Sequence, residues 1–259
     1  MKNIYPIVFC LFSFTVSAQE NYEIQVYGSP TMTRRQTIFE LHSNYTFLGG
    51  KDIVDGVLPS FHSLHETIEI THGITDNFEM GFYLFTNYTP NNGWQIIGTH
   101  IRPRIAAPEK WKLPVGLSLS VEIGWQKQEY STQTFSLEIR PIIDKTFGNF
   151  YLALNPVLGV SLNGVNQPSA PAFAPNLKAA YAVSPKMSLG TEYYGDLGPL
   201  NQFEKITQQN HALFLVADLY VDPKWEVNFG PGFGLTEATD GFVMKFILGR
   251  RISWSKKRN

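Results

Sequence analysis

The sequence has almost no cysteine, no long apolar run beyond its first residues, and no excess of charge of either sign. Its single cysteine is Cys10, so no disulfide can stabilise the rest of the chain, and a disulfide-rich secreted scaffold is excluded. After residue 18 no stretch holds eighteen consecutive apolar residues, which excludes helical membrane spans. Lys and Arg total 21 against 22 Asp and Glu, a balance that predicts no nucleic-acid partner.

The first eighteen residues have the features of an export signal. Lys2 precedes an apolar run from Ile4 to Val16, and small side chains stand one and three residues before a cut after Ala18. We therefore predict a cleaved signal peptide over 1–18. The next segment, 19–34, shows little sustained alternation after Tyr27. Its composition is compatible with a periplasmic tail, a plug inside a lumen or an extra short strand.

Alternation of apolar and polar residues is what this sequence has in abundance. In 114–126, PVGLSLSVEIGWQ, the apolar side chains share one parity and the polar side chains the other. Period two predicts strands with one apolar and one polar face. No segment of useful length has a helical period, so the chain is predicted to be all-β. Twelve strands are predicted, at 35–47, 62–72, 78–88, 94–106, 115–127, 133–145, 150–162, 173–183, 187–195, 210–220, 224–234 and 241–254.

One parity of these strands is rich in ionisable residues. It carries Glu69, Arg102, Glu122 and Lys245 among others, while the opposite parity carries mostly Leu, Ile and Phe. So many charges cannot form a dry core. A soluble sandwich would expose this face to solvent, whereas a membrane barrel would turn it toward a lumen.

The connections favour the barrel over the sandwich. Every second connection is mostly a tight turn, and the other series includes the longer segments 48–61, 163–172 and 195–210. This asymmetry is typical of the periplasmic turns and extracellular loops of outer-membrane barrels. Aromatic residues also recur near the strand ends, where interfacial girdles belong: Tyr45, Phe47, Trp94, Trp125, Tyr151, Tyr193, Tyr220, Trp225 and Trp254.

We therefore predict an antiparallel transmembrane up-and-down β-barrel of about twelve strands over 35–254, with a C-terminal tail at 255–259. Its predicted location is the outer membrane of a Gram-negative bacterium, and its predicted partners are outer-membrane lipid and the barrel-assembly machinery. Two charged residues do not fit, because Glu66 and Arg250 fall on the lipid-facing parity. Either they lie near an interface or a bulge shifts the parity locally.

Three neighbouring strands carry the candidate functional residues. His100, Arg102 and Arg104 form a basic ladder on 94–106, Glu122 lies on the next strand, and Glu138 and Arg140 lie on the one after. Cross-strand pairing of these groups would create a transverse field across the lumen. One interpretation is a constriction that contacts and screens solutes by charge. The other is a structural ion-pair network that fills a narrow lumen.

Two further groups of residues have side chains that could carry chemistry. Ser63 and His65 share a strand face, which raises an outer-membrane lipid acyl hydrolase as an alternative function. The order of the two residues and their luminal parity favour polar wall residues instead. His42, His65 and His100 also share the luminal parity, but no pair of histidines has a diagnostic ligand interval. The sequence predicts no metal site, no cofactor and no catalytic residue.

The segment HETIEITHGITDNFEMGFYLF, from His65 to Phe85, resembles a hairpin of a known barrel family. That family is the outer-membrane transporter-like group named for a putative MetA pathway of phenol degradation. The closing GPGFGLTEATDGFVMKFILGRRI looks similar to the end of such barrels, and the Ala-Gln cleavage context resembles Bacteroidetes exports. The resemblance implies passive passage of small hydrophobic or aromatic solutes, without enzymatic activity. A structural or adhesion barrel with a closed lumen, acting through loops 48–61 and 195–210, is the remaining alternative.

Overall fold

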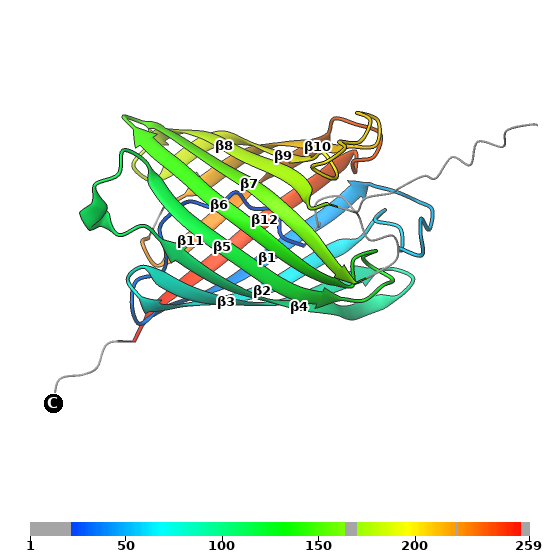
Figure 1. Cartoon of the computed structure of the whole chain (residues 1–259), viewed down its shortest axis with the longest axis horizontal. Helices are drawn as coiled ribbons and strands as arrows, with labels where there is room; N and C mark the ends of the chain where they lie inside the picture. Colours follow the sequence, from blue (N-terminus) through cyan, green and yellow to red (C-terminus); the bar gives the residue numbers. More distant parts are fainter. Residues whose placement is uncertain (1–21, 164–169, 221, 255–259) are drawn as a thin grey trace, which may run out of the picture.

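The chain forms a closed antiparallel β-barrel in its computed structural model, which describes residues 22–163, 170–220 and 222–254. Consecutive strands pair with one another, and the first pairs with the last to close the barrel (Figure 1). The strands in the described residues are β1 (Gln36–Leu48), β2 (Leu64–Thr75), β3 (Phe78–Thr89), β4 (Gly93–Ala106), β5 (Gly116–Gln126), β6 (Phe135–Phe147), β7 (Phe150–Asn163), β8 (Ala172–Ser184), β9 (Met187–Asp196), β10 (Asn210–Leu219), β11 (Trp225–Gly234) and β12 (Phe242–Ser253). A 3-10 turn, η1 (Glu109–Trp111), joins β4 to β5.

The predicted strands and the predicted barrel are confirmed, and the sandwich alternative is wrong. The largest difference in a strand end is at β2, predicted to end at 72 and observed to end at Thr75. The predicted signal peptide at 1–18 and the tail at 255–259 lie outside the described residues. Within the described part of the chain, no helix is both long and apolar enough to span a bilayer.

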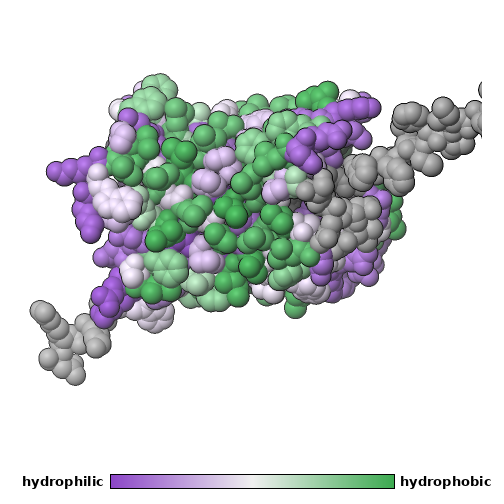
Figure 2. Space-filling model, in the orientation of Figure 1, coloured by the Kyte–Doolittle hydropathy of each residue, from purple (hydrophilic) through white to green (hydrophobic). Residues whose placement is uncertain are grey.

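The two parities of the strands occupy the faces that the alternation predicts. Leu117, Leu119 and Ile123 of β5 point outward and remain about two-fifths exposed, at 40, 41 and 43%. Figure 2 shows the resulting apolar surface between two more hydrophilic ends. The ionisable parity faces the interior, where Glu69 and Lys245 are 0% and 1% exposed. This inversion of the usual soluble pattern is what a barrel surrounded by lipid requires.

Most of the predicted girdle residues are exposed at the strand ends. Trp94 and Trp125 lie at the end of the barrel that carries the long loops, and Trp225 and Trp254 lie at the other end. Tyr151 is an exception, and its assignment to the girdle was wrong. Its parity is that of the luminal Ala153, and its hydroxyl donates to Asp144 inside the barrel at 3.0 Å.

The two misfit charges lie on regular strands. Register shifts occur at other positions, such as Thr46/Leu48 and Phe85/Thr86. Arg250 stacks on the outward ring of Trp225 at 4.6 Å, close to the turn that precedes β11. Glu66 accepts a hydrogen bond from Ser43 at 2.5 Å, near the loop end of β2. Both therefore lie near a rim, where a charged side chain costs little.

Residues 22–35, here named the luminal segment, run lengthwise along the inside of the barrel and reach its turn end, where residues 33–35 are exposed (Figure 1). Tyr22 packs against His65 and Phe85 of β2 and β3, toward the loop end. At the opposite end the backbone amide of Arg34 donates to Asp76 in the turn between β2 and β3. Gly73 allows this close approach, because a Cβ there would lie 2.1 Å from the carbonyl oxygen of Thr33.

Candidate functional site in the barrel lumen

The barrel wall binds the backbone of the luminal segment through side chains. Asn155 of β7 accepts a hydrogen bond from the amide of Tyr27 at 2.8 Å and donates to its carbonyl at 3.0 Å. Arg104 donates to the carbonyls of Gly28 and Pro30 at 3.0 and 2.9 Å. Lys245 of β12 donates to the carbonyl of Ile24 at 3.0 Å. An extended segment without strand partners therefore has its polar backbone satisfied inside the barrel.

Carboxylates of the barrel wall bind the part of the luminal segment that lies toward the turn end. Asp144 of β6 accepts hydrogen bonds from the amide and hydroxyl of Ser29 at 3.0 and 2.6 Å. Glu79 of β3 accepts one from the amide of Met32 at 2.5 Å. Charge-assisted bonds of this kind are stronger than neutral ones. They hold the segment in one position along the barrel axis.

The predicted basic ladder of β4 is luminal, and its two arginines pair with β2 and β3. Arg102 bonds to Glu69 at 2.6 Å and to Glu79 at 3.0 Å, and it is 2% exposed. Arg104 also bonds to Glu79, at 2.7 Å. Because two arginines share one carboxylate, these groups form one connected network rather than separate pairs. Its members fix one another's rotamers within the lumen.

The other four predicted residues form two pairs on the adjoining strands. His100 Nδ1 and Glu122 are in direct contact between β4 and β5. Gly124 makes room for this imidazole, because a Cβ there would overlap it at 1.6 Å. Arg140 bonds to Glu138 two residues away on β6, at 2.7 Å. The expected pairing of the basic ladder across β5 and β6 is therefore limited to His100.

Tyr27 of the luminal segment brings the arginines of both groups together. The guanidinium carbons of Arg102, Arg104 and Arg140 lie 5.0, 5.5 and 4.9 Å from the centroid of its ring. Its hydroxyl contacts Glu23 and lies 3.2 Å from the hydroxyl of Tyr83. A cation is attracted to the face of an aromatic ring, and this cation–π attraction is stronger where water is excluded. The ring thus occupies the centre of the predicted constriction.

A second ionic cluster lies on the opposite wall. Glu192 of β9 pairs with Lys178 of β8 at 3.0 Å and contacts Lys245 of β12 directly. Lys178 also bonds to Asp218 at 2.8 Å, and Asn228 donates to the same carboxylate at 2.7 Å. The two clusters face each other across the luminal segment. Sequence parity placed these residues in the lumen, but without the register it could not predict their partners.

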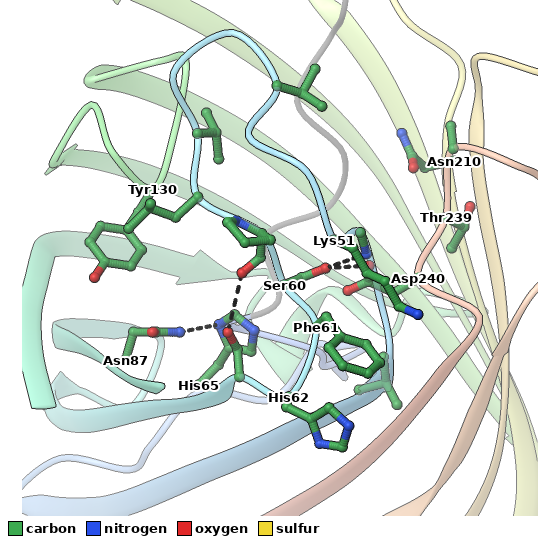
Figure 3. Close-up of a pocket in the computed structure, with 18 of the residues that line it drawn as sticks. Lys51, Ser60, Phe61, His62, His65, Asn87, Tyr130, Asn210, Thr239 and Asp240 are labelled. Atoms are coloured by element: carbon green, nitrogen blue, oxygen red, sulfur yellow. Dashed lines mark hydrogen bonds between the residues drawn. The ribbon is translucent and has the colours of Figure 1, made fainter. Parts of the chain in front are cut away.

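At the loop end the lumen opens into a cavity of about 1080 Å³. Tyr22 and Ile24 of the luminal segment line it from below, and the segment 50–63 lines it from the side (Figure 3). Apolar surface makes up the larger part of its wall. His65, Asn87, Gln126 and Asn210 contribute neutral polar groups, and the loop residues Lys51, Asp52, Glu237 and Asp240 contribute charged ones. Aromatic rings of Phe61, Tyr130, Phe214 and Phe233 add apolar surface.

Ser63 and His65 both line this cavity but have different hydrogen-bond partners. The hydroxyl of Ser63 donates to the carbonyl of Pro59 at 3.5 Å, and His65 Nδ1 lies 3.2 Å from the amide nitrogen of Asn87 (Figure 3). A nucleophile needs its base within hydrogen-bond reach. Within the described residues, no hydrogen bond joins the Ser63 hydroxyl to the His65 ring, so this arrangement gives the hydrolase alternative no support.

Comparison with known proteins finds similar structures but no similar sequences. No family model matches the chain, and no curated protein matches it. The fold is similar to that of the KdgM porin, with a TM-score of 0.51 and 10% identity over 84% of this chain and 99% of that one. It is also similar to the NanC porin, with a TM-score of 0.52 and 6% identity over 84% of this chain and 100% of that one. Identities this low show the fold alone.

These likenesses confirm the predicted class, a closed barrel of the kind found in outer-membrane porins. The narrower resemblance to the phenol-degradation group has no support from a family model. The KdgM porin has also been solved in complex with a disordered oligogalacturonate, and that ligand belongs to that protein.

Proposed function

We propose that this chain is an outer-membrane channel for small solutes, whose luminal segment forms the constriction. The observation that carries the proposal is the loop-end cavity of about 1080 Å³, which leads directly onto Tyr22 and Ile24 of that segment. The closed barrel supplies a polar path through lipid. The likeness of its fold to porins supports passive passage rather than catalysis.

The lining of the cavity supports small solutes with both polar and apolar surface. Phe61, Tyr130 and Phe214 offer aromatic faces, while Asn87 and Gln126 offer amides. Pockets of this mixed kind bury the apolar body of a ligand and orient it through a few polar groups. We therefore propose small aromatic or hydrophobic solutes as the cargo, entering at the loop end.

A pair of alanines on β10 provides a matched test. Ala212 lines the cavity, whereas Ala217 lies on the outward parity of the same strand. The rate of liposome swelling is measured with a monosaccharide and with 4-hydroxybenzoate, using wild type, Ala212→Trp and Ala217→Trp. The proposal expects swelling above that of empty liposomes, slowed in Ala212→Trp and unchanged in Ala217→Trp. Swelling equal to that of empty liposomes, for correctly inserted wild type, would favour the closed structural barrel.

A further inference from the structure

Glu40, His42 and Glu69 meet on the luminal wall where β1 pairs with β2. Glu40 and Glu69 are directly opposite in the register, and His42 lies two residues along β1 on the same face. Each offers one ligand atom, and these atoms all lie within 4.8 Å of one another. All three residues are buried, at 8, 0 and 0% exposure for Glu40, His42 and Glu69. The set combines imidazole nitrogen and carboxylate oxygen, the donors that Zn²⁺ and similar ions bind.

The two carboxylates of this cluster are only partly balanced by the neighbouring cationic groups. Like charges placed directly opposite on a sheet repel, and burial increases the cost. Glu69 forms an ion pair with Arg102, but Arg102 also forms one with Glu79. Among the described residues, Glu40 takes part in no ion pair within 4.0 Å. A cation between the two carboxylates would remove the repulsion.

Unsatisfied polar atoms point to the same position. Neither ring nitrogen of His42 has a hydrogen-bond partner among the described residues, and neither does Glu69 Oε2. Buried polar atoms are nearly always paired, so three such atoms in one place require an explanation. A proton on Glu40 would relieve the repulsion between the carboxylates. It would leave His42 Nδ1 without a partner and His42 Nε2 with only its 3.4 Å contact to Glu69 Oε2.

The spacing of the atoms fits ligands of one ion better than a hydrogen bond. His42 Nε2 and Glu69 Oε2 are 3.4 Å apart, beyond the usual N–H···O distance of about 2.9–3.0 Å. Two ligands about 2.0–2.2 Å from a tetrahedral zinc ion are separated by roughly 3.3–3.6 Å. The ligand oxygen of Glu40 lies within 4.8 Å of both atoms.

The other oxygen of Glu69 is already oriented by the protein. Thr71 and Arg102 both donate to Glu69 Oε1 at 2.6 Å. These bonds turn Oε2 toward His42, in the manner of groups that position metal ligands. We propose that Glu40, His42 and Glu69 bind a divalent transition-metal ion of the zinc type inside the lumen, with a fourth position left for solvent.

Zinc binding to the refolded full barrel tests the proposal. Titration calorimetry with zinc chloride is performed on wild type, His42→Ala and Glu40→Gln, with His65→Ala as the matched control. His65 is also a buried luminal histidine, but Asn87 is its partner. We expect one site that is weakened at least about tenfold in His42→Ala and in Glu40→Gln and retained in His65→Ala.

Thermal unfolding supplies a second readout that does not depend on other zinc-binding groups. Excess zinc is expected to raise the unfolding midpoint of wild type and His65→Ala, and to leave that of His42→Ala unchanged. Zinc affinity and midpoint shifts equal in wild type and His42→Ala would overturn the proposal. A midpoint of wild type that moves with pH but not with zinc would also overturn it, because the cluster would then hold a proton only.

Discussion

The two halves of the lumen differ in how their buried polar groups are stabilised. Toward the turns, Arg102, Arg104 and Glu79 form charged networks that close around the luminal segment. Toward the loops, the barrel wall around the cavity carries neutral groups such as Asn87 and Gln126, and the charged residues that line it, Lys51, Asp52, Glu237 and Asp240, lie in loops. Charges in a low-dielectric wall are stable only when paired, so the charged side chains of this half bond to one another and to the luminal segment. Neutral amides tolerate exposure to a solute, so the loop-end half can remain open.

The largest effect is expected from breaking the charged half at Arg102. Arg102→Met leaves Glu69 without its arginine partner and removes one of the two arginines that bind Glu79. Removal of one member of a buried ion-pair network costs about 3–5 kcal/mol. Urea unfolding of the refolded barrel measures this loss. Arg250→Met is the control, because Arg250 stacks on Trp225 at the rim and contributes about 0.5–1 kcal/mol. Equal losses in the two variants would contradict the account.

A smaller effect is expected where the wall holds the luminal segment. Asn155→Leu removes both hydrogen bonds to the backbone of Tyr27. Loss of two partners for a buried backbone costs about 1–3 kcal/mol, and it should raise hydrogen exchange in 22–35. The control is Asn176→Leu, which changes the residue directly opposite Asn155. Asn176 makes no hydrogen bond to that segment in the described part of the chain. Exchange that rises equally in both variants would mean that the Asn155 bonds do not hold the segment.

The neutral half should tolerate substitution that the charged half does not. Both amide atoms of Gln126 are buried and lack partners among the residues described here. Gln126→Leu should therefore leave the free energy of unfolding unchanged or raise it by about 1–2 kcal/mol. The same urea titration measures it. A loss comparable with that of Arg102→Met would remove the distinction between the two halves.

The smallest effect concerns the loop 197–209 above the cavity. Burial, with a further contribution from the Asp196 carboxylate, raises the pKa of Glu204 to about 7. A raised carboxyl pKa favours the neutral form in the folded loop. Its stabilising contribution is therefore present at low pH and is lost as pH rises from the ordinary value of 4.5 toward 7. Proteolysis of this loop should be slower at pH 5 than at pH 8, and Glu204→Gln should reduce the difference. A pH dependence that persists undiminished in Glu204→Gln would assign it to another group.

The barrel could be predicted from the sequence because apolar and polar residues alternate with period two in the strands. In β5 and β12 the parity alone decides which side chains meet lipid, and both faces were assigned correctly. Parity also placed Glu69 and Glu192 in the lumen. Their ion-pair partners depend on the register between strands, and no local feature of the sequence determines that register. The luminal segment has little sustained alternation after Tyr27. Its position depends on Asn155, Arg104 and Asp144, residues far away in the chain, so it stayed one of three alternatives.

The proposed site of the three β1 and β2 side chains was not predicted from the sequence for a related reason. A search for histidine pairs at ligand intervals passes over Glu40 and His42, because their third member, Glu69, lies on another strand. Only the pairing of β1 with β2 brings the two carboxylates together. Acidic residues that face one another across a predicted hairpin would have been a usable signal.

The central claim is that the luminal segment, and not the barrel wall, sets the constriction. Single-channel conductance in a planar bilayer tests it most directly, with refolded wild type and a variant that lacks residues 22–33. We expect a conductance that is several-fold larger in the deletion variant, because the arginines around Tyr27 would then line an open lumen. Equal conductance in the two proteins would show that the wall alone limits passage, and it would contradict the account.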